Sequence, residues 1–198
     1  MSAVIRLAED SDAEAIRAIY APIVETTVIS FEQQPPSRSD IAERLSKGLV
    51  DLPWLVYVCD GKVLGYAYAG RHRARAAYQW SVESSVYVHD GARRAGVARG
   101  LYRALFDVLR FQGFFNLFAG ITLPNPASVG FHESVGFRPI GVYCCVGFKF
   151  GDWRDVGWWQ LSLQDRPRAP TPPTPLSSIR DDPAVRDALA RGRNAIRD

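Results

Sequence analysis

The chain has 198 residues, of which 47% are hydrophobic and 23% are charged, and its formal net charge is +3. These proportions are typical of a globular protein with one full hydrophobic core, and the basic excess is too small to indicate a nucleic-acid partner. The sequence contains no apolar run as long as a membrane-spanning helix, and the acidic N-terminus "MSAVIRLAED" lacks the apolar core of a signal peptide, so we expect a cytoplasmic protein with no membrane partner.

The first third of the chain contains patterns of both helices and strands. Alternating apolar residues predict a strand over 4–8, and two apolar runs around an Asp-Gly turn predict a β-hairpin over 53–70. Between them, apolar residues at helical spacing predict helices over 12–24 and 39–49, each preceded by Ser or Asp residues of the kind that cap helices.

The remaining elements follow in quick succession. We predict a long strand over 78–88, then a loop that runs into an amphipathic helix over 93–113. A strand over 115–122, a short helix within 125–137 and a strand–turn–strand unit over 138–163 complete the pattern. The order β-α-α-β-β-β-α-β-α-β-β predicts the α+β class, with a mixed central sheet flanked by helices.

The composition changes after residue 164, and we therefore divide the chain into a domain of residues 1–164 and a tail of residues 165–198. The tail begins with "DRPRAPTPPTPLSS", a proline-rich linker that we expect to be extended. It continues with "DDPAVRDALARGRNAIRD", whose pattern favours a charged helix. We expect this helix to be marginal or dependent on a partner, and we assign it no chemistry.

A basic turn between a strand and a helix, in "VYVHDGARRAGVARGLY" (86–102), is the first candidate binding site. Gly91 and Gly96 have the spacing of a P-loop, but Val97 and Ala98 replace its lysine and hydroxyl residue, and the dinucleotide fingerprint is also absent. Small residues at 96 and 98 leave the N–H groups of the helix start open to a pyrophosphate. The alternative is a basic helix cap without a ligand.

Two motifs in order resemble those of one known family. The loop fits the pattern Gln/Arg-x-x-Gly-x-Gly/Ala, and "NPASVGFHESVGF" (125–137) is an asparagine followed by a helix that ends in Gly-Phe. Both resemble motifs of the GCN5-related N-acetyltransferases (GNATs), over residues 3–164. The stretches "AYAGRHRARAAYQWSVESSVYV" and "GFKFGDWRDVGWWQL" resemble the phosphinothricin and methionine sulfone/sulfoximine acetyltransferases within that superfamily. The resemblance implies the GNAT acyl-CoA N-acyltransferase fold.

The resemblance also implies the residues that bind acetyl-CoA as co-substrate. The main chain of Val86, Tyr87 and Val88 would hold the pantetheine arm and the acetyl carbonyl, and an N–H group there would stabilise the oxyanion. The pyrophosphate would bind the loop formed by Arg93, Arg94, Ala95, Gly96, Val97, Ala98 and Arg99. Asn125 and Ser134 would add further contacts. We expect no metal, because the three cysteines and three histidines lack zinc-ligand spacing.

Two residues are candidates for acid–base catalysis. Glu83 interrupts an apolar strand just before the cofactor loop, and the resemblance implies that it removes a proton from the amine substrate. The alternative is a strand glutamate that points to water. His132 stands seven residues after Asn125, where many GNATs have a tyrosine that protonates the thiolate. The resemblance implies a catalytic histidine there, which would act as acid, base or pocket wall; the alternative is a packed helix histidine.

Substrate recognition is assigned to a second group of residues. Arg71, Arg73 and Arg75 occupy alternate positions, so in an extended segment they would share one face and could bind an oxyanion. The alternative is a solvated basic loop. The resemblance implies substrate contacts at Arg73, Arg75 and Tyr78. Phe31, in the loop after the first predicted helix, is a separate candidate for a pocket wall.

These inferences lead to one main functional hypothesis. We expect an enzyme that transfers an acetyl group from acetyl-CoA to the amine of a small amino acid or analogue, such as phosphinothricin, methionine sulfone or methionine sulfoximine. Transfer would be direct, in a ternary complex, and the protein would be a homodimer without a nucleic-acid partner. The alternatives are a non-catalytic acetyl-CoA-binding module and a protein lysine acetyltransferase.

Overall fold

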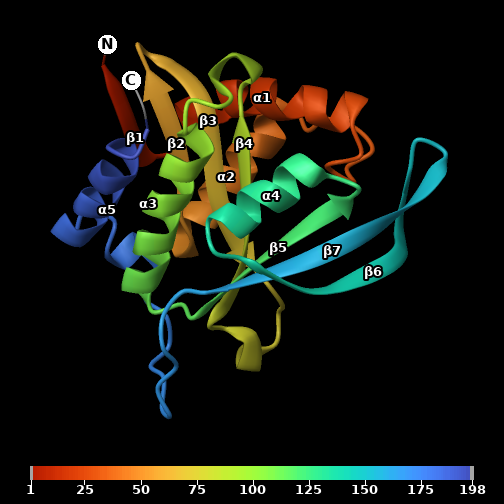
Figure 1. The fold of residues 1–198 in the computed structure, drawn as a ribbon. Coiled ribbons are helices and arrows are strands. Elements are labelled where there is room, and N and C mark those ends of the chain that lie inside the picture. Colours follow the sequence, from red (N-terminus) through yellow and green to blue (C-terminus); the bar gives the residue numbers. More distant parts are fainter. Residues whose placement is uncertain (1, 197–198) are drawn as a thin grey trace.

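A computed structural model describes residues 2–196 and contains one seven-stranded sheet in the order β1-β2-β3-β4-β5-β7-β6 (Figure 1). The strands are β1 Ala3–Leu7, β2 Trp54–Cys59, β3 Lys62–Arg71, β4 Ser81–Val88, β5 Asn116–Leu123, β6 Arg138–Lys149 and β7 Asp152–Ser162. The α-helices are α1 Ala13–Thr26, α2 Arg38–Asp51, α3 Val97–Gln112, α4 Pro126–Ser134 and α5 Pro183–Arg193.

The predicted order of elements through β7 and the α+β class are both confirmed. All neighbouring strands are antiparallel except β4 and β5, which are parallel and are connected by α3. No helix within residues 2–196 has the length and apolar character needed to cross a membrane.

Two hydrophobic clusters hold the helices on opposite faces of the sheet. On β2, Leu55 packs in the cluster of α3, whereas its neighbours Trp54 and Val56 pack in the cluster of α1 and α2. This alternation follows from the two-residue period of a strand, and it makes β2 a central strand that is buried on both sides. The sheet therefore presents an α1/α2 face and an α3 face (Figure 1).

The sheet divides between β4 and β5. These strands pair only over residues 81–83 of β4 and 116–118 of β5, and both then continue for five residues without pairing to each other. Each strand keeps its other neighbour along its whole length, because β3 pairs with β4 and β7 pairs with β5. The result is an opening between two half-sheets.

The β6–β7 hairpin projects from the second half-sheet (Figure 1). Its pairing is interrupted between Tyr143 and Gly147, where Cys144, Cys145 and Val146 bulge out opposite Asp155. Asp155 accepts a hydrogen bond from the Cys145 main-chain N–H at 2.7 Å. Most of β6 is exposed, so this hairpin is the least covered part of the sheet.

The tail differs from the marginal helix that we expected. Helix α5 lies beside α3 (Figure 1), and its residues Val185 and Ala188 are buried against Val108 of α3. The contact is closest at two glycines: a Cβ atom on Gly192 would lie 2.6 Å from the carbonyl oxygen of Gly100 in the first turn of α3. The many charged residues of the tail suggested a marginal helix, but its few apolar residues are enough to pack α5 against α3.

The proline-rich segment before α5 is also attached to the rest of the molecule. The indole N–H of Trp80 donates to the carbonyl oxygen of Thr171 at 2.8 Å. The main-chain N–H of Thr174 donates to the carbonyl oxygen of Gln112, also at 2.8 Å. These bonds fix the path of the segment from β7 to α5.

Candidate active site

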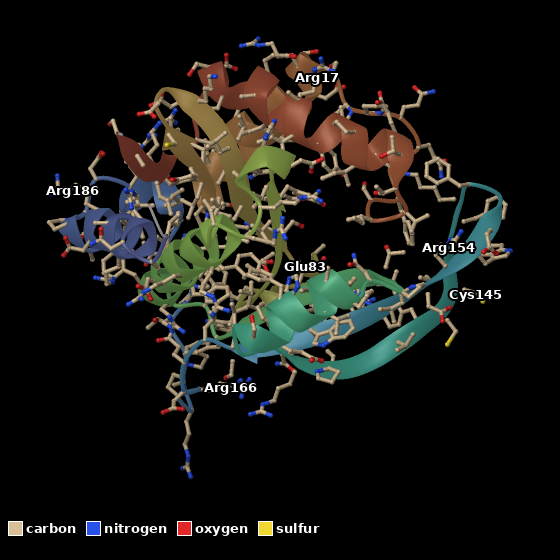
Figure 2. The ribbon with its side chains drawn as sticks, turned by 45° about the horizontal axis from the view of Figure 1, so that its top comes forward. Arg17, Glu83, Cys145, Arg154, Arg166 and Arg186 are labelled. Carbon is tan, nitrogen blue, oxygen red and sulfur yellow. The ribbon has the colours of Figure 1, made fainter. Side chains whose placement is uncertain are left out.

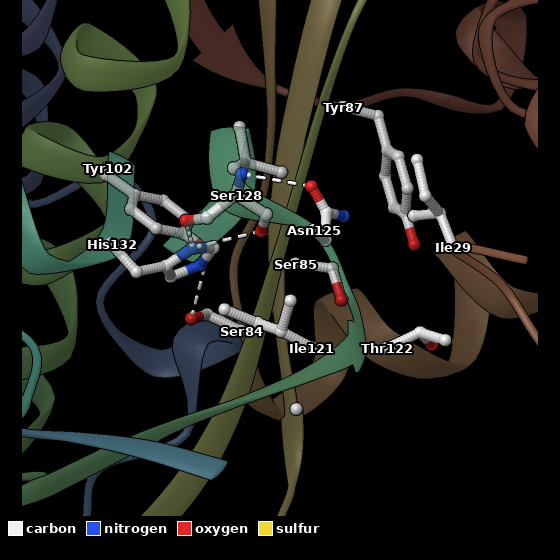
Figure 3. A pocket seen from close by; sticks show the side chains of 12 residues that line it. Ile29, Ser84, Ser85, Tyr87, Tyr102, Ile121, Thr122, Asn125, Ser128 and His132 are labelled. Carbon is white, nitrogen blue, oxygen red and sulfur yellow. Dashed lines mark hydrogen bonds between the residues drawn. The ribbon is translucent and has the colours of Figure 1, made fainter. Parts of the chain in front are cut away.

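A cavity of about 70 Å³ lies where β4 and β5 separate (Figure 3). Residues 84–87 of β4 line one side and residues 120–122 of β5 the other, and α4 and α3 close one end. The remaining lining residues are Ile29, Tyr102, Asn125, Ser128 and His132. Because β4 and β5 do not pair here, their main-chain groups are available to an extended ligand that enters between them.

His132 is buried in this cavity and belongs to a hydrogen-bonded chain (Figure 3). Its Nδ1 lies 2.8 Å from the carbonyl oxygen of Ser128, which can only accept, so Nδ1 carries the proton. Its Nε2 therefore accepts from the hydroxyl of Tyr102 at 3.0 Å, and Tyr102 in turn accepts from Ser84 at 3.2 Å. Burial lowers the pKa of His132 below its usual 6.5, which favours this neutral form.

The basic turn lies between β4 and α3, where the sequence predicted it. His89 Nδ1 accepts from the N–H of Gly91 at 3.1 Å, and Arg93 pairs with Asp90 at 2.6 Å, so the first part of the turn is internally braced. Arg94 and Gly96 have positive φ angles of 65° and 88°. Glycine adopts this conformation without strain, and Gly96 is the N-cap of α3.

The N-terminus of α3 has no side-chain cap. The first N–H groups of a helix are left without intrahelical partners, and the positive end of the helix dipole lies there. Ala95, Gly96 and Ala98 are partly exposed and carry little or no side chain around this end, while Val97 is buried and anchors the helix. The geometry is therefore that of an anion site.

Contacts between α3 and α4 bring the two predicted cofactor motifs together. The guanidinium group of Arg99 donates to the hydroxyl of Ser134 at 2.9 Å. At the other end of α4, the Asn125 side chain accepts from the N–H of Ser128 at 3.1 Å and caps the helix. Asn125 thus fixes the start of the helix that carries His132.

Glu83 occupies the last position at which β4 pairs with β5, opposite Phe118 (Figure 2). Its Oε1 accepts a hydrogen bond from Nδ1 of His72 at 2.8 Å and a longer contact from Arg73 at 3.4 Å. The Glu83 side chain is 35% exposed and that of His72 is 14% exposed. The carboxylate is thus oriented by two neighbours but remains accessible to a ligand.

Aromatic rings surround the His72–Glu83 pair. The imidazole of His72 stacks on Phe118 with ring centres 4.3 Å apart, and Tyr78 and Trp158 meet it edge-on at 6.1 and 6.0 Å. The guanidinium carbon of Arg73 lies 6.0 Å from the centre of the Trp158 ring. These contacts form a rigid apolar wall with a cationic rim beside the carboxylate.

The two candidate catalytic residues lie on opposite faces of β4. Consecutive residues of a strand point to opposite sides, so Glu83 faces away from Ser84, which joins the Tyr102–His132 chain. The opening between β4 and β5 connects the two faces. A ligand that enters from the α3 face can therefore meet one that enters from the face of Glu83.

Comparison with known proteins places this geometry in a family. The family model "Acetyltransferase (GNAT) domain" matches residues 5–158. The chain belongs to the GNAT acetyltransferase family. It is therefore an N-acetyltransferase, and the resemblance seen in its loop and α4 motifs is confirmed.

Two curated GNAT relatives illustrate the similarity. The chain is 42% identical over 161 residues to the phosphinothricin N-acetyltransferase of Alcaligenes faecalis, a match that covers 80% of this chain and 82% of that protein. It is 35% identical over 162 residues to the L-methionine sulfoximine/L-methionine sulfone acetyltransferase of Salmonella typhimurium, covering 81% and 95%.

A solved structure gives the same result for the fold. The phosphinothricin acetyltransferase of Sinorhizobium meliloti, in complex with acetyl-CoA, superimposes with a TM-score of 0.80 and 32% sequence identity. The match covers 89% of this chain and 99% of that one. The predicted GNAT fold is thereby confirmed.

One geometric expectation for the substrate side is wrong. Strand β3 ends at Arg71, and the chain then turns into a short 3₁₀ helix over Ala76–Tyr78, so the three alternate arginines do not share an extended face. Arg71 pairs with Asp51 at 2.6 Å, whereas Arg73 turns to Glu83. Arg75 is exposed at the N-cap of the 3₁₀ helix.

Of the other predicted substrate residues, Tyr78 lies beside the His72–Glu83 pair, whereas Phe31 lies against the β6–β7 hairpin. Tyr78 is 43% exposed beside His72. Phe31, in the segment between α1 and α2, packs on Gly147 of β6 so closely that its ring occupies the place of a Cβ atom there. Within residues 2–196, His, Cys, Asp and Glu side chains form no group of three or more that could hold a metal ion.

Sequence reasoning missed three polar residues at or near this GNAT site. His72 was overlooked although β3 and β4 pair with Gly70 opposite Glu83, a register that puts His72 diagonally across from the carboxylate. Tyr102 was not singled out, although the structure places its hydroxyl between Ser84 and His132. Lys149 looked like an ordinary strand lysine, and no pattern in the sequence marks its burial.

Proposed function

We propose that this GNAT enzyme transfers the acetyl group of acetyl-CoA to the amino group of a small amino acid or amino-acid analogue. The observation that carries the proposal is the position of Glu83, held by His72 and Arg73 at the point where β4 and β5 separate. The relatives named for phosphinothricin and for methionine sulfoximine and sulfone suggest substrates of that class.

The cofactor is assigned to the α3 face. The pyrophosphate binds the uncapped start of α3 and the loop that precedes it, residues 93–99, with Asn125 and Ser134 at its side. The pantetheine arm lies along Val86, Tyr87 and Val88, whose strand does not pair with β5. A main-chain N–H group in this stretch stabilises the oxyanion of the thioester carbonyl.

Proton transfers are assigned to the two faces of β4. An ammonium ion cannot attack a thioester, so Glu83 takes a proton from the amine, directly or through a water molecule. The amine nitrogen then forms its bond to the acetyl carbon, the C–S bond breaks, and the nitrogen releases its second proton, which balances the one that the thiolate takes up. The departing thiolate takes up a proton on the side where neutral His132 and the Tyr102 hydroxyl lie.

The substrate side supplies an acid-binding rim. Arg73 and Arg75 offer guanidinium groups to a carboxylate, phosphinate or sulfone oxygen, and Tyr78 and Phe31 are walls for the side chain. This combination fits a small anionic amine better than a peptide that carries many charges.

The test is free-thiol release from acetyl-CoA in the presence of a panel of amines: phosphinothricin, methionine sulfone, methionine sulfoximine, common amino acids and a lysine-containing peptide. We expect turnover on phosphinothricin, methionine sulfone or methionine sulfoximine. Tight acetyl-CoA binding without turnover on any amine would indicate a non-catalytic binding module. Turnover on the peptide alone would indicate a protein lysine acetyltransferase.

We also propose that a second copy of the chain covers the β6–β7 hairpin. Five large apolar side chains on β6 are each about half exposed, namely Ile140, Val142, Tyr143, Val146 and Phe148. An apolar patch of this kind on an edge strand is costly to leave in water and open to pairing with another strand. The homodimer suggested by the sequence resemblance would bury it.

A further inference from the structure

Lys149, the last residue of β6, is the most unusual buried group outside the cavity. It is only 2% exposed, and its ammonium group donates to the carbonyl oxygens of Val24 at 2.7 Å and of Ser30 at 2.8 Å. It also lies 5.0 Å from the centre of the Phe150 ring. Burial lowers the pKa of Lys149, because the charged form is removed from water.

A buried ammonium ion is expensive unless its hydrogen bonds are well made. Here the carbonyl acceptors come from the end of α1 and from the segment between α1 and α2, residues 27–37, which we call the α1–α2 segment. Lys149 therefore joins this segment to the β6–β7 hairpin, more than 100 residues away along the chain. Its contacts fix a tertiary position rather than a local turn.

The residues on either side of Ser30 lie against the cavity and against the hairpin. Ile29 lines the cavity beside Tyr87 (Figure 3), and it remains 46% exposed. Phe31 packs on Gly147 of the hairpin. Because Lys149 binds the carbonyl oxygen of Ser30, it fixes the backbone that carries the side chains of both Ile29 and Phe31.

Two further contacts show that the α1–α2 segment is seated as a unit. The Tyr20 hydroxyl lies 2.6 Å from the Ser30 hydroxyl, and the side-chain amide of Gln33 donates to the carbonyl oxygen of Phe148 at 3.2 Å. Gln33 is exposed and its bond is long, whereas Ser30 is buried. The strongest attachment of the segment to the hairpin is therefore the Lys149 ammonium group.

We propose that Lys149 is a positioning residue for the amine substrate: it fixes the α1–α2 segment to the hairpin and thereby sets the wall, formed by Ile29 and Phe31, that selects the substrate side chain. This inference rests on the proposed function, since the wall belongs to the amine site. Lys149 is 2% exposed and does not line the cavity, so it acts through these two side chains.

The experiment compares Lys149→Met, which keeps the length of the side chain but removes its charge, with Lys149→Arg and with Lys62→Met. Lys62 is an exposed lysine at the start of β3 and serves as the matched control. For each protein we would measure kcat and KM for a series of amino acids of increasing size, and the Kd of acetyl-CoA by calorimetry.

We expect Lys149→Met to raise the KM of the best amine about tenfold, the effect of one lost charge-assisted hydrogen bond at a wall. In Lys149→Met, selectivity between small and large substrate side chains should weaken, and the Kd of acetyl-CoA should stay within about twofold of the wild-type value. In Lys149→Arg, the KM of the amine should lie between those of the wild type and Lys149→Met. An amine KM equal to that of Lys62→Met, or an equal loss of acetyl-CoA affinity, would overturn the proposal.

Hydrogen–deuterium exchange provides a readout that does not depend on turnover. Lys149→Met should speed exchange in the α1–α2 segment and leave the loop before α3 unchanged; unchanged exchange in the segment overturns the inference even if no amine is found. If Lys149→Met does not fold, Gly147→Ala tests the same wall, because its Cβ atom displaces the Phe31 ring. Wild type that is inactive on every amine would instead refute the proposed function.

Discussion

Glu83 carries two properties that a catalytic base needs. It is oriented by His72 at 2.8 Å, and about a third of its side chain is still open to a ligand. A strand glutamate on an ordinary solvent face would have neither a partly buried histidine partner nor a break in the sheet at its own position. These features favour a catalytic role over the solvated alternative.

Replacement of this carboxylate gives a direct test. Glu83→Gln should lower kcat by roughly a hundredfold or more, because an amide cannot take a proton from the amine, while the Kd of acetyl-CoA changes little. Steady-state kinetics and calorimetry measure the two quantities. Glu43→Gln, on the exposed face of α2, is the control. Unchanged kcat in Glu83→Gln would exclude Glu83 as the base.

His132 predicts a pH dependence of stability. Its pKa is lowered by burial, so between that lowered value and 6.5 the unfolded chain binds a proton that the folded chain does not. The free energy of unfolding therefore rises with pH through this window and falls on acidification. We expect the melting temperature to drop from pH 7 to pH 5, and to drop less in His132→Gln. Parallel pH profiles for the two proteins would contradict this account.

At the scale of elements, the turn before α3 depends on backbone conformation. Gly96 has a φ of +88° at the uncapped helix start, so a larger residue would both strain the turn and obstruct the N–H groups. Gly96→Val should weaken acetyl-CoA binding at least tenfold by calorimetry, roughly the loss of one or two hydrogen bonds to a charged ligand.

A matched control separates strain from ligand contact. Gly61 has a φ of +76° in the β2–β3 turn, and a Cβ atom there meets nothing within 4 Å. Gly61→Val introduces similar backbone strain outside the cofactor loop and should lower the melting temperature without changing the Kd. Equal loss of affinity in both variants would mean that the turn acts only through stability.

The elements show how far the sequence can be read. Their order and type could be predicted because hydrophobic periods and Asp-Gly or proline breaks are local signals, and the loop before α3 was recognised from residues next to one another in the chain. The end of the hairpin was predicted to within one residue, but the turn after Arg71 into the 3₁₀ helix was not predicted. Its position depends on pairing with β4 and on the Asp51 contact, which adjacent residues do not encode.

The geometry of the candidate site is harder to predict from the sequence, because it depends on contacts between residues that are not adjacent in the chain. Glu83 and His132 were found through motifs, but their placement on opposite faces of β4 follows from strand register and from the contact with Tyr102. Lys149 and His72 interact with residues that are 119 and 11 positions away. Such pairs become visible only when the sheet is assembled.

On the scale of the whole molecule, the exposed hairpin predicts self-association. Val142→Lys combined with Val146→Lys should convert a dimer into a monomer, because two charges would be buried in the apolar contact. Sedimentation velocity measures the outcome. Val50→Lys is the control, since Val50 on α2 is 53% exposed and Val142 is 51% exposed. A monomeric wild type at micromolar concentration would refute the dimer.

The docking of α5 also has a consequence for the order in which the molecule is made. Gly192 packs against Gly100, in the first turn of the helix whose start we assign to the pyrophosphate. The ribosome adds Gly192 long after Gly100. The helix whose start we assign to the pyrophosphate therefore reaches its final packing only after every strand of the sheet beneath it has been synthesised.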